Sequence, residues 1–114
     1  MSRLLRYSTF LRARNSDVII EGCASGGGRF DAGALAYEPQ IWTSDNSDAH
    51  SRTRIQYGTS LCYPLSGMDC HVSVCPNHQT GRVTPFKTRC DVAYFGATGY
   101  ELDPRKLTEE ECGR

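Results

Sequence analysis

The chain has 114 residues, 13 basic and 13 acidic side chains, and 39% hydrophobic residues, so its length suits one domain that can bury a core of its own. A formal net charge of zero argues against the positive field that binding to nucleic acid or to an anionic membrane requires. No apolar run approaches the roughly 20 residues of a membrane-spanning helix, and we therefore expect a soluble protein that binds neither nucleic acid nor membranes.

The first predicted element is an amphipathic helix at the N-terminus. Leu4, Tyr7 and Leu11 would share one face, and arginines the other. An Arg-rich start without acidic residues is also typical of an organellar presequence, and we favour the plain helix. The apolar residues are interrupted by charges, so no secretory signal is predicted. We therefore expect a cytoplasmic protein with reduced thiols.

Strand-like and helix-like segments alternate along the rest of the chain. The predicted strands cover residues 17–21, 40–43, 68–74 and 99–102. A helix is predicted after the cap-type residues 44–47, through about residue 57, and another over 86–95; Thr108 and Glu111 form a capping box that would open a last helix. Strands that alternate with helices indicate βαβ units and a parallel sheet, hence an α/β fold.

Functional groups of parallel α/β sheets gather at the carboxyl ends of the strands. The first predicted strand is followed by Cys23, Ser25 and a glycine run from Gly26, and the second by a polar segment that contains Asp45. The glycine run lacks a Walker lysine, and Asp31 stands where a dinucleotide fingerprint needs its third glycine. It is either a tight turn or a close backbone approach to a neutral polyol, with Cys23 or Ser25 reaching a hydroxyl.

Asp45 has two interpretations. Its carboxylate would cap the following helix, or it would act as a general acid whose pKa an apolar wall raises. Trp42, three positions earlier, would supply that wall and stack on a sugar face, or would simply fill the core. We assign no catalytic role to the three histidines, His50, His71 and His78.

A cysteine–histidine cluster supports an alternative without catalysis. Cys70, His71, Cys75 and His78 offer two sulfurs and two imidazoles, which suits structural zinc. Their spacing is unusual for a zinc finger, and adjacent residues of a strand point to opposite faces. The alternative is a small zinc- or partner-binding α/β module.

Six segments in order resemble one enzyme family, the α-galactosidases of glycoside hydrolase family 36. They are residues 21–31, 39–46, 55–60, 71–73, 76–82 and 95–102. The resemblance runs from about residue 17 to 111. It implies that residues 1–114 are a partial catalytic domain, the second half of a TIM (β/α)8 barrel with strands 5 to 8.

The resemblance also implies the roles of individual residues. Asp45 matches the acid/base position of these retaining enzymes, and Cys23 and Gly26 match residues that contact galactose; Ser25 and Trp42 are added as substrate-binding candidates. The family's nucleophile lies in a Lys-Trp-Asp sequence on the fourth strand, whereas the only tryptophan here is Trp42. The nucleophile is therefore absent from this chain.

The complete enzyme is expected to cleave terminal α-galactosyl residues from oligosaccharides of the melibiose and raffinose type, with no metal and no organic cofactor. We expect this chain alone to be inactive. Its expected partners are α-galactoside oligosaccharides and either a second copy of the chain, as a homo-oligomer, or a missing N-terminal half-barrel.

Overall fold

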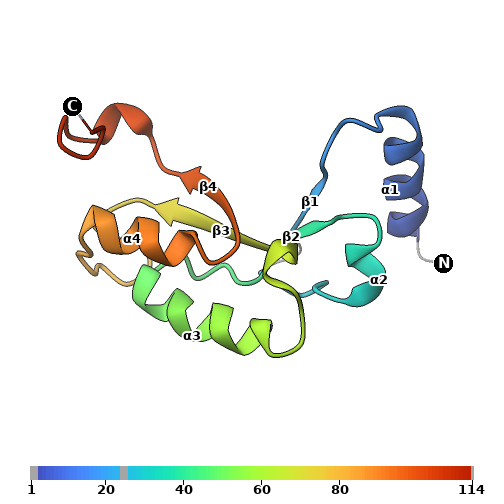
Figure 1. Cartoon of the computed structure of the whole chain (residues 1–114), viewed down its shortest axis with the longest axis horizontal. Helices are drawn as coiled ribbons and strands as arrows, with labels where there is room; N and C mark the ends of the chain where they lie inside the picture. The colour runs from blue at the N-terminus through green and yellow to red at the C-terminus, as the bar shows by residue number, and fades with distance from the viewer. Residues whose placement is uncertain (1–2, 24–25, 114) are drawn as a thin grey trace.

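The computed structural model describes residues 3–23 and 26–113, with a four-stranded parallel sheet as its centre (Figure 1). The elements in chain order are α1 (Arg3–Arg14), β1 (Glu21–Gly22), α2 (Ala32–Leu35), β2 (Gln40–Trp42), α3 (Ala49–Ser60), η1 (Leu65–Gly67), β3 (Met68–Ser73), α4 (Phe86–Ala93), β4 (Ala97–Glu101) and η2 (Pro104–Lys106). Among the described helices, none combines the length and the apolar character needed to cross a membrane.

The strands follow one another in the sheet as they do in the chain, in the order β1-β2-β3-β4, and each neighbouring pair is parallel. Consecutive parallel strands need crossover connections, and α2, α3 and α4 lie in the three connections. All four strands therefore end at the same edge of the sheet. The predicted α/β class with a parallel sheet is confirmed.

The core lies between the sheet and the helices on one side of it. Met68, Cys70 and Val72 alternate along β3, are at most 1% exposed and pack against Ala93 of α4. The partly buried residues around this cluster are Phe30, Phe86, Cys90 and Leu102. Because side chains alternate along a strand, Asp69 and His71 point to the opposite face of the sheet.

The first predicted strand, residues 17–21, differs from the structure. Only Glu21 and Gly22 pair with β2, and Val18 and Ile19 are 54% and 65% exposed. β2 has three residues, so it offers no pairing to the residues before Glu21. The prediction of a buried strand over 17–21 is wrong in length and in burial.

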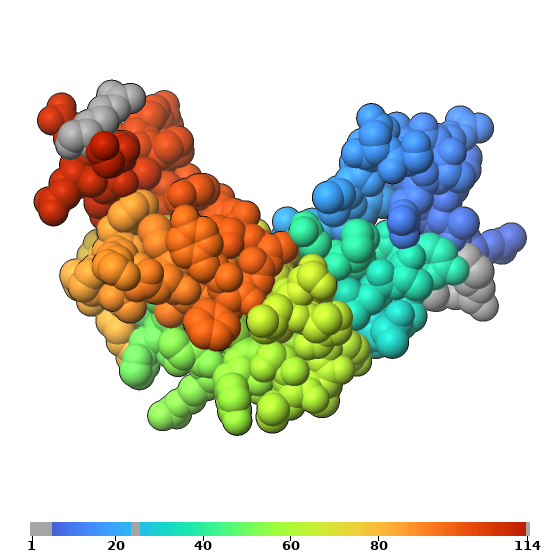
Figure 2. Space-filling model, viewed as in Figure 1, coloured from blue at the N-terminus to red at the C-terminus, as the bar shows by residue number. Residues whose placement is uncertain are grey.

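The predicted N-terminal helix is present, but only part of the predicted face contacts the protein: Leu11 is half-buried, and the side chain of Leu4 lies outside the described residues. Tyr7 is 60% exposed, whereas Ser8 is 3% exposed and its hydroxyl donates to Glu38 at 3.0 Å. Arg12 donates to the carbonyl of Ala36 at 2.8 Å. Polar contacts to the segment after α2 thus hold α1, which projects at the opposite end of the molecule from the segment after β4 (Figure 2).

The capping box predicted for a last helix forms, and no helix follows it within the described residues, which end at Gly113. Thr108 N donates to the Glu111 carboxylate at 3.0 Å and Glu111 N donates to the Thr108 hydroxyl at 3.2 Å. One turn follows, closed by a bond from Cys112 N to Thr108 O at 3.0 Å. Gly113 then adopts a φ of 72°, which is typical of the residue that ends a helix.

Candidate active site

Asp45 lies in the loop between β2 and α3, just beyond the carboxyl end of β2. The residue is exposed, and no described residue forms a hydrogen bond or an ion pair with its carboxylate. Its main-chain carbonyl accepts a hydrogen bond from Gln79 Nε2 at 2.7 Å. A carboxyl group whose backbone is held and whose oxygens are free is suited to proton transfer.

The helix cap is Asp48, not Asp45. Asp48 Oδ2 accepts from Ser51 N at 3.3 Å and from Ser51 Oγ at 3.0 Å, and the Asp48 residue is 0% exposed. The cap interpretation of Asp45 is therefore wrong. Several cap-type residues follow one another here, and propensity alone does not distinguish them.

The glycine run packs directly on the main chain around Asp45. Gly26 and Gly27 have φ values of 57° and 82°, a region that side chains disfavour. A Cβ on Gly26 would lie 2.1 Å from Asp45 N, and one on Gly27 would lie 2.4 Å from Thr43 O. Both glycines are thus required by conformation and by space, and they bring this loop to the side of Asp45.

Two other predicted site residues belong to this loop. Cys23 is exposed and directly follows β1, and its carbonyl accepts from the Arg29 guanidinium at 3.2 Å, which ties the two ends of the loop together. Ser25 lies outside the described residues. The structure therefore brings Cys23, Gly26 and Asp45 to one edge of the sheet.

Trp42 is 7% exposed and is flanked by two groups of its own chain. The Arg52 guanidinium carbon lies 4.1 Å from the centre of the indole, and the His71 ring stacks on it at 4.5 Å with an interplanar angle of 17°. The indole is thus nearly buried against groups of its own chain in this structure. Trp42 instead supports the base of the segment that carries Asp45.

Arg52, a buried residue of α3, fixes the same segment from the helix side. It donates to Ser44 O at 3.2 Å, to Asp69 O at 2.7 Å and to Gln56 Oε1 at 3.1 Å. Burial lowers the pKa of its guanidinium, which nevertheless stays protonated in proteins. Arg52 thereby ties the start of the segment that carries Asp45 to β3 and α3.

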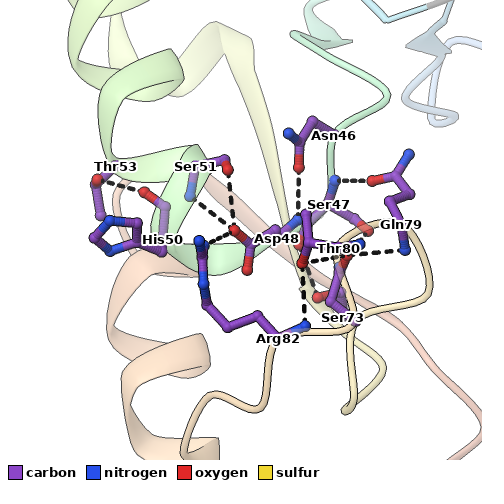
Figure 3. Close-up of polar contacts among 11 residues, drawn as sticks. Asn46, Ser47, Asp48, His50, Ser51, Thr53, Ser73, Gln79, Thr80 and Arg82 are labelled. Atoms are coloured by element: carbon purple, nitrogen blue, oxygen red, sulfur yellow. Dashed lines mark hydrogen bonds and ion pairs between the residues drawn. The ribbon is translucent and has the colours of Figure 1, made fainter.

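A loop after β3 fixes the far side of the same segment (Figure 3). Gln79 Oε1 accepts from Ser47 N at 2.9 Å, and Ser73 Oγ donates to Ser47 O at 2.8 Å. Arg82 forms an ion pair with the buried carboxylate of Asp48. The loops after β2 and β3 are thus joined by hydrogen bonds and by one ion pair.

A second group of ionisable residues lies on the sheet. The potential ligand atoms of Glu21, Asp69 and His71 lie within 4.8 Å of one another, and His71 Nε2 is 3.9 Å from Glu21 Oε2. Asp69 is 2% exposed. Burial and the neighbouring Glu21 carboxylate raise the pKa of Asp69 to about 7. The raised pKa of Asp69 thus follows from its burial and from the carboxylate beside it.

The predicted zinc ligands do not converge in the described part of the chain. Cys70 is buried in the core, while His71 stacks on Trp42. Cys75 Sγ lies 3.6 Å from Thr84 O, and His78 is exposed. Side chains alternate between the two faces of β3, so Cys70 and His71 point to opposite faces, as the sequence indicated. The zinc-module alternative therefore lacks its ligand set.

The main residues that the sequence did not single out are Gln79, Arg82 and Arg52. Gln79 and Arg82 follow the carboxyl end of β3, so the strand-end rule that selected Asp45 also points to their loop. Arg52 had no such signal, because an arginine in a helix is usually solvated.

A cavity of about 540 Å³ lies elsewhere in the described chain. Residues of α3 form most of its lining, together with Leu65, Val92 and Phe95. None of the predicted site residues contributes to it. The candidate site is thus an open strand-end surface.

Comparison with known proteins identifies the family. The family model described as Melibiase matches residues 3–114. AgaSK of Mediterraneibacter gnavus, a bifunctional α-galactosidase/sucrose kinase, is 62% identical over 101 residues, which are 89% of this chain and 11% of that protein. The solved galactosidase domain of AgaSK has a TM-score of 0.89 and 59% identity over 93% of this chain and 15% of its own.

A GH36 α-galactosidase from Geobacillus stearothermophilus, an AgaA variant solved in complex with raffinose, gives a similar match. The TM-score is 0.88 at 57% identity, over 93% of this chain and 15% of that one. The chain therefore spans between 11% and 15% of the length of these relatives.

Proposed function

The chain belongs to the melibiase family, and we propose that it supplies the acid/base edge of the active site of a retaining α-galactosidase. The observation that carries the proposal is the position of Asp45. Its carboxylate is unengaged by the described residues, stands at the carboxyl end of a parallel strand, and lies beside a glycine loop that leaves no space for side chains.

In fold terms, the proposal makes β1 to β4 the fifth to eighth strands of a TIM (β/α)8 barrel. Sequential parallel order with helical crossovers supports this, because a barrel of this type is built from such units. β1 and β4 are the two edge strands of the sheet, and in a barrel each would pair with a further strand. The proposed partner is an N-terminal half-barrel or a second copy of this chain.

The chemistry assigned to Asp45 is proton transfer in both steps of a retaining mechanism. A nucleophilic carboxylate attacks the anomeric carbon while the protonated Asp45 donates to the glycosidic oxygen, and the sugar alcohol leaves. Asp45, now ionised, then removes a proton from the water that hydrolyses the covalent intermediate. These steps need two carboxyl groups about 5–5.5 Å apart and no metal ion.

The proposed substrates are oligosaccharides with a terminal α-galactosyl residue, of the melibiose or raffinose type. The support is the raffinose complex of the Geobacillus relative. Cys23, Ser25 and Gly26 are the proposed sugar contacts of this chain. For Trp42 we now propose an indirect role, support of the Asp45 segment, because both neighbours of its ring are groups of the chain itself.

We also propose a cytoplasmic location with reduced thiols. All six cysteines are free in the structure, and free thiols are typical of a reducing compartment.

The test is a chimeric enzyme. This chain replaces the matching segment of Geobacillus AgaA, to which it is 57% identical over 111 residues. We expect the chimera to hydrolyse raffinose and the 114-residue chain alone to be inactive, because its sequence contains no Lys-Trp-Asp. Asp45→Asn in the chimera should lower the rate on raffinose about 10²–10⁴-fold.

The matched control is Asp91→Asn, which changes an exposed aspartate that pairs with Lys87. Its activity should equal that of the parent chimera. Equal activities of Asp45→Asn and Asp91→Asn would overturn the proposed role of Asp45, and turnover of an aryl α-galactoside by the chain alone would overturn its predicted inactivity.

A further inference from the structure

We propose that Gln79 is a positioning residue that sets the orientation of Asp45 for proton transfer. The inference rests on the proposed acid/base role of Asp45 and adds a residue on which that role depends. Gln79 lies 34 positions further along the chain, in the loop after β3.

The side-chain amide of Gln79 bonds the main chain at two points around Asp45. Its Nε2 donates to Asp45 O at 2.7 Å, and its Oε1 accepts from Ser47 N at 2.9 Å. A neutral primary amide is the side-chain group that offers a donor and an acceptor side by side. Glutamate keeps only the acceptor, and methionine of similar length keeps neither function.

The loop that carries Gln79 is closed by its own hydrogen bonds. Asn77 N donates to Arg82 O at 2.9 Å and Gly81 N donates to Asn77 O at 2.8 Å. The Asn77 side chain, 4% exposed, accepts from Gln79 N at 3.0 Å and from Thr80 N at 3.0 Å. The hydrogen bonds within the loop therefore hold the backbone of Gln79 in place independently of the contact between its side chain and Asp45.

Both ends of this loop are also anchored on the segment after Asp45. Asn77 Nδ2 donates to Ser47 Oγ at 3.1 Å, and Arg82 pairs with Asp48. Figure 3 shows Gln79 and Arg82 approaching residues 46–48 from the same loop. Rotation of the Asp45 backbone must therefore break the hydrogen bonds of the Gln79 side chain, while the loop that carries Gln79 stays in place.

The side chain of Gln79 bonds the main chain around Asp45 and not its carboxylate, so its effect is on orientation. Such an effect depends on the leaving group. A sugar alcohol leaves only when it is protonated, whereas a dinitrophenolate leaves without a proton. Misplacement of the general acid should therefore slow raffinose cleavage and leave the first step with a dinitrophenyl galactoside almost unchanged.

The experiment uses the chimeric α-galactosidase that contains this whole chain. Gln79→Met removes both hydrogen bonds, and His78→Ala is the control, because His78 is the exposed neighbour of Gln79. For Gln79→Met we expect kcat/KM on raffinose to fall about 10–100-fold, a part of the contribution of general acid catalysis. On 2,4-dinitrophenyl α-galactoside it should fall less than about threefold. His78→Ala should match the parent on both substrates.

Hydrogen exchange gives the structural readout in the same chimera. Gln79→Met should speed exchange of the Ser47 amide about tenfold, equivalent to the loss of one hydrogen bond, and Gln79→Glu should retain much of its protection. Equal losses on the two substrates would overturn the proposal, because a general loss of structure lowers both, and so would unchanged Ser47 exchange. An inactive parent chimera would overturn the proposed function itself and the role of Gln79 with it.

Discussion

Gly26 and Asp45 are in main-chain contact, although 19 positions separate them in the sequence: a Cβ on Gly26 would lie 2.1 Å from Asp45 N. Such a distance is far below van der Waals contact, so one of the two loops would have to move. The loop after β1 and the loop after β2 therefore determine each other's position.

Alanine substitutions at two glycines distinguish the effect of this main-chain contact on stability from the effect of a left-handed φ. Gly26→Ala should lower the free energy of unfolding by more than the roughly 1–2 kcal/mol that a left-handed φ costs, because a clash with main chain is added. Gly81→Ala, at a φ of 69° with no atom within 4 Å, should lose only the φ contribution. Urea unfolding of the 114-residue chain measures both.

The positive control is Gly58→Ala. Gly58 lies within α3, has no positive φ and has no atom within 4 Å of an added Cβ. Alanine should therefore stabilise the chain by about 0.5–1 kcal/mol. If Gly26→Ala costs no more than Gly81→Ala, the contact between Gly26 and Asp45 does not constrain the loop.

The parts of the site that the sequence predicted are those at strand ends. Cys23, Gly26 and Asp45 lie in the loops after β1 and β2, and parallel strands align such loops without any knowledge of side-chain packing. The same rule points to the loop that carries Gln79, but within that loop it does not single out Gln79. Its bonds to Asp45 and Ser47 depend on the path of a loop whose closure involves Asn77 and Arg82.

Trp42 and residues 17–21 show where local pattern is insufficient. The indole was expected to face a ligand or the core, but Arg52 and His71, which come from later elements, decide its surroundings. The β-branched run at 17–21 predicted a buried strand, but burial needs a covering partner, and Val18 and Ile19 have none in the described chain.

The stability of the chain should depend on the ionisation of Asp69. Its folded-state pKa is raised to about 7, above the unfolded value near 3.9, so the native state binds the proton more tightly. This contribution is fully present below about pH 4 and is lost as the pH rises to about 7. Ionisation at pH 8 should cost on the order of 2–4 kcal/mol.

Asp69→Asn removes this ionisation and provides the measurement. Urea unfolding at pH 4.5, 6 and 8 should show the variant gaining stability relative to the parent as the pH rises, with the largest gain at pH 8. Asp91→Asn, an exposed site on α4, should track the parent at each pH. A constant difference between Asp69→Asn and the parent across this range would contradict the raised pKa.

The ion pair of Arg82 with Asp48 should contribute measurably to stability, because the Asp48 carboxylate is inaccessible to solvent. The Asp48 side chain is 0% exposed and the Arg82 side chain is 44% exposed. Removal of one partner from a buried pair costs about 3–5 kcal/mol. Because the Arg82 side chain is partly exposed to solvent, the loss of stability should be smaller for this pair. We expect Arg82→Met to cost roughly 1–3 kcal/mol.

Two further variants separate this pair from a general effect of arginine removal. Arg105 pairs with Asp103 at the surface and its side chain is 87% exposed, so Arg105→Met should leave the urea midpoint unchanged. Asp48→Asn combined with Arg82→Met removes the unpaired buried charge, and the double variant should therefore lose less stability than the sum of the single variants. Strict additivity would show that Arg82 does not stabilise the loop by pairing with Asp48.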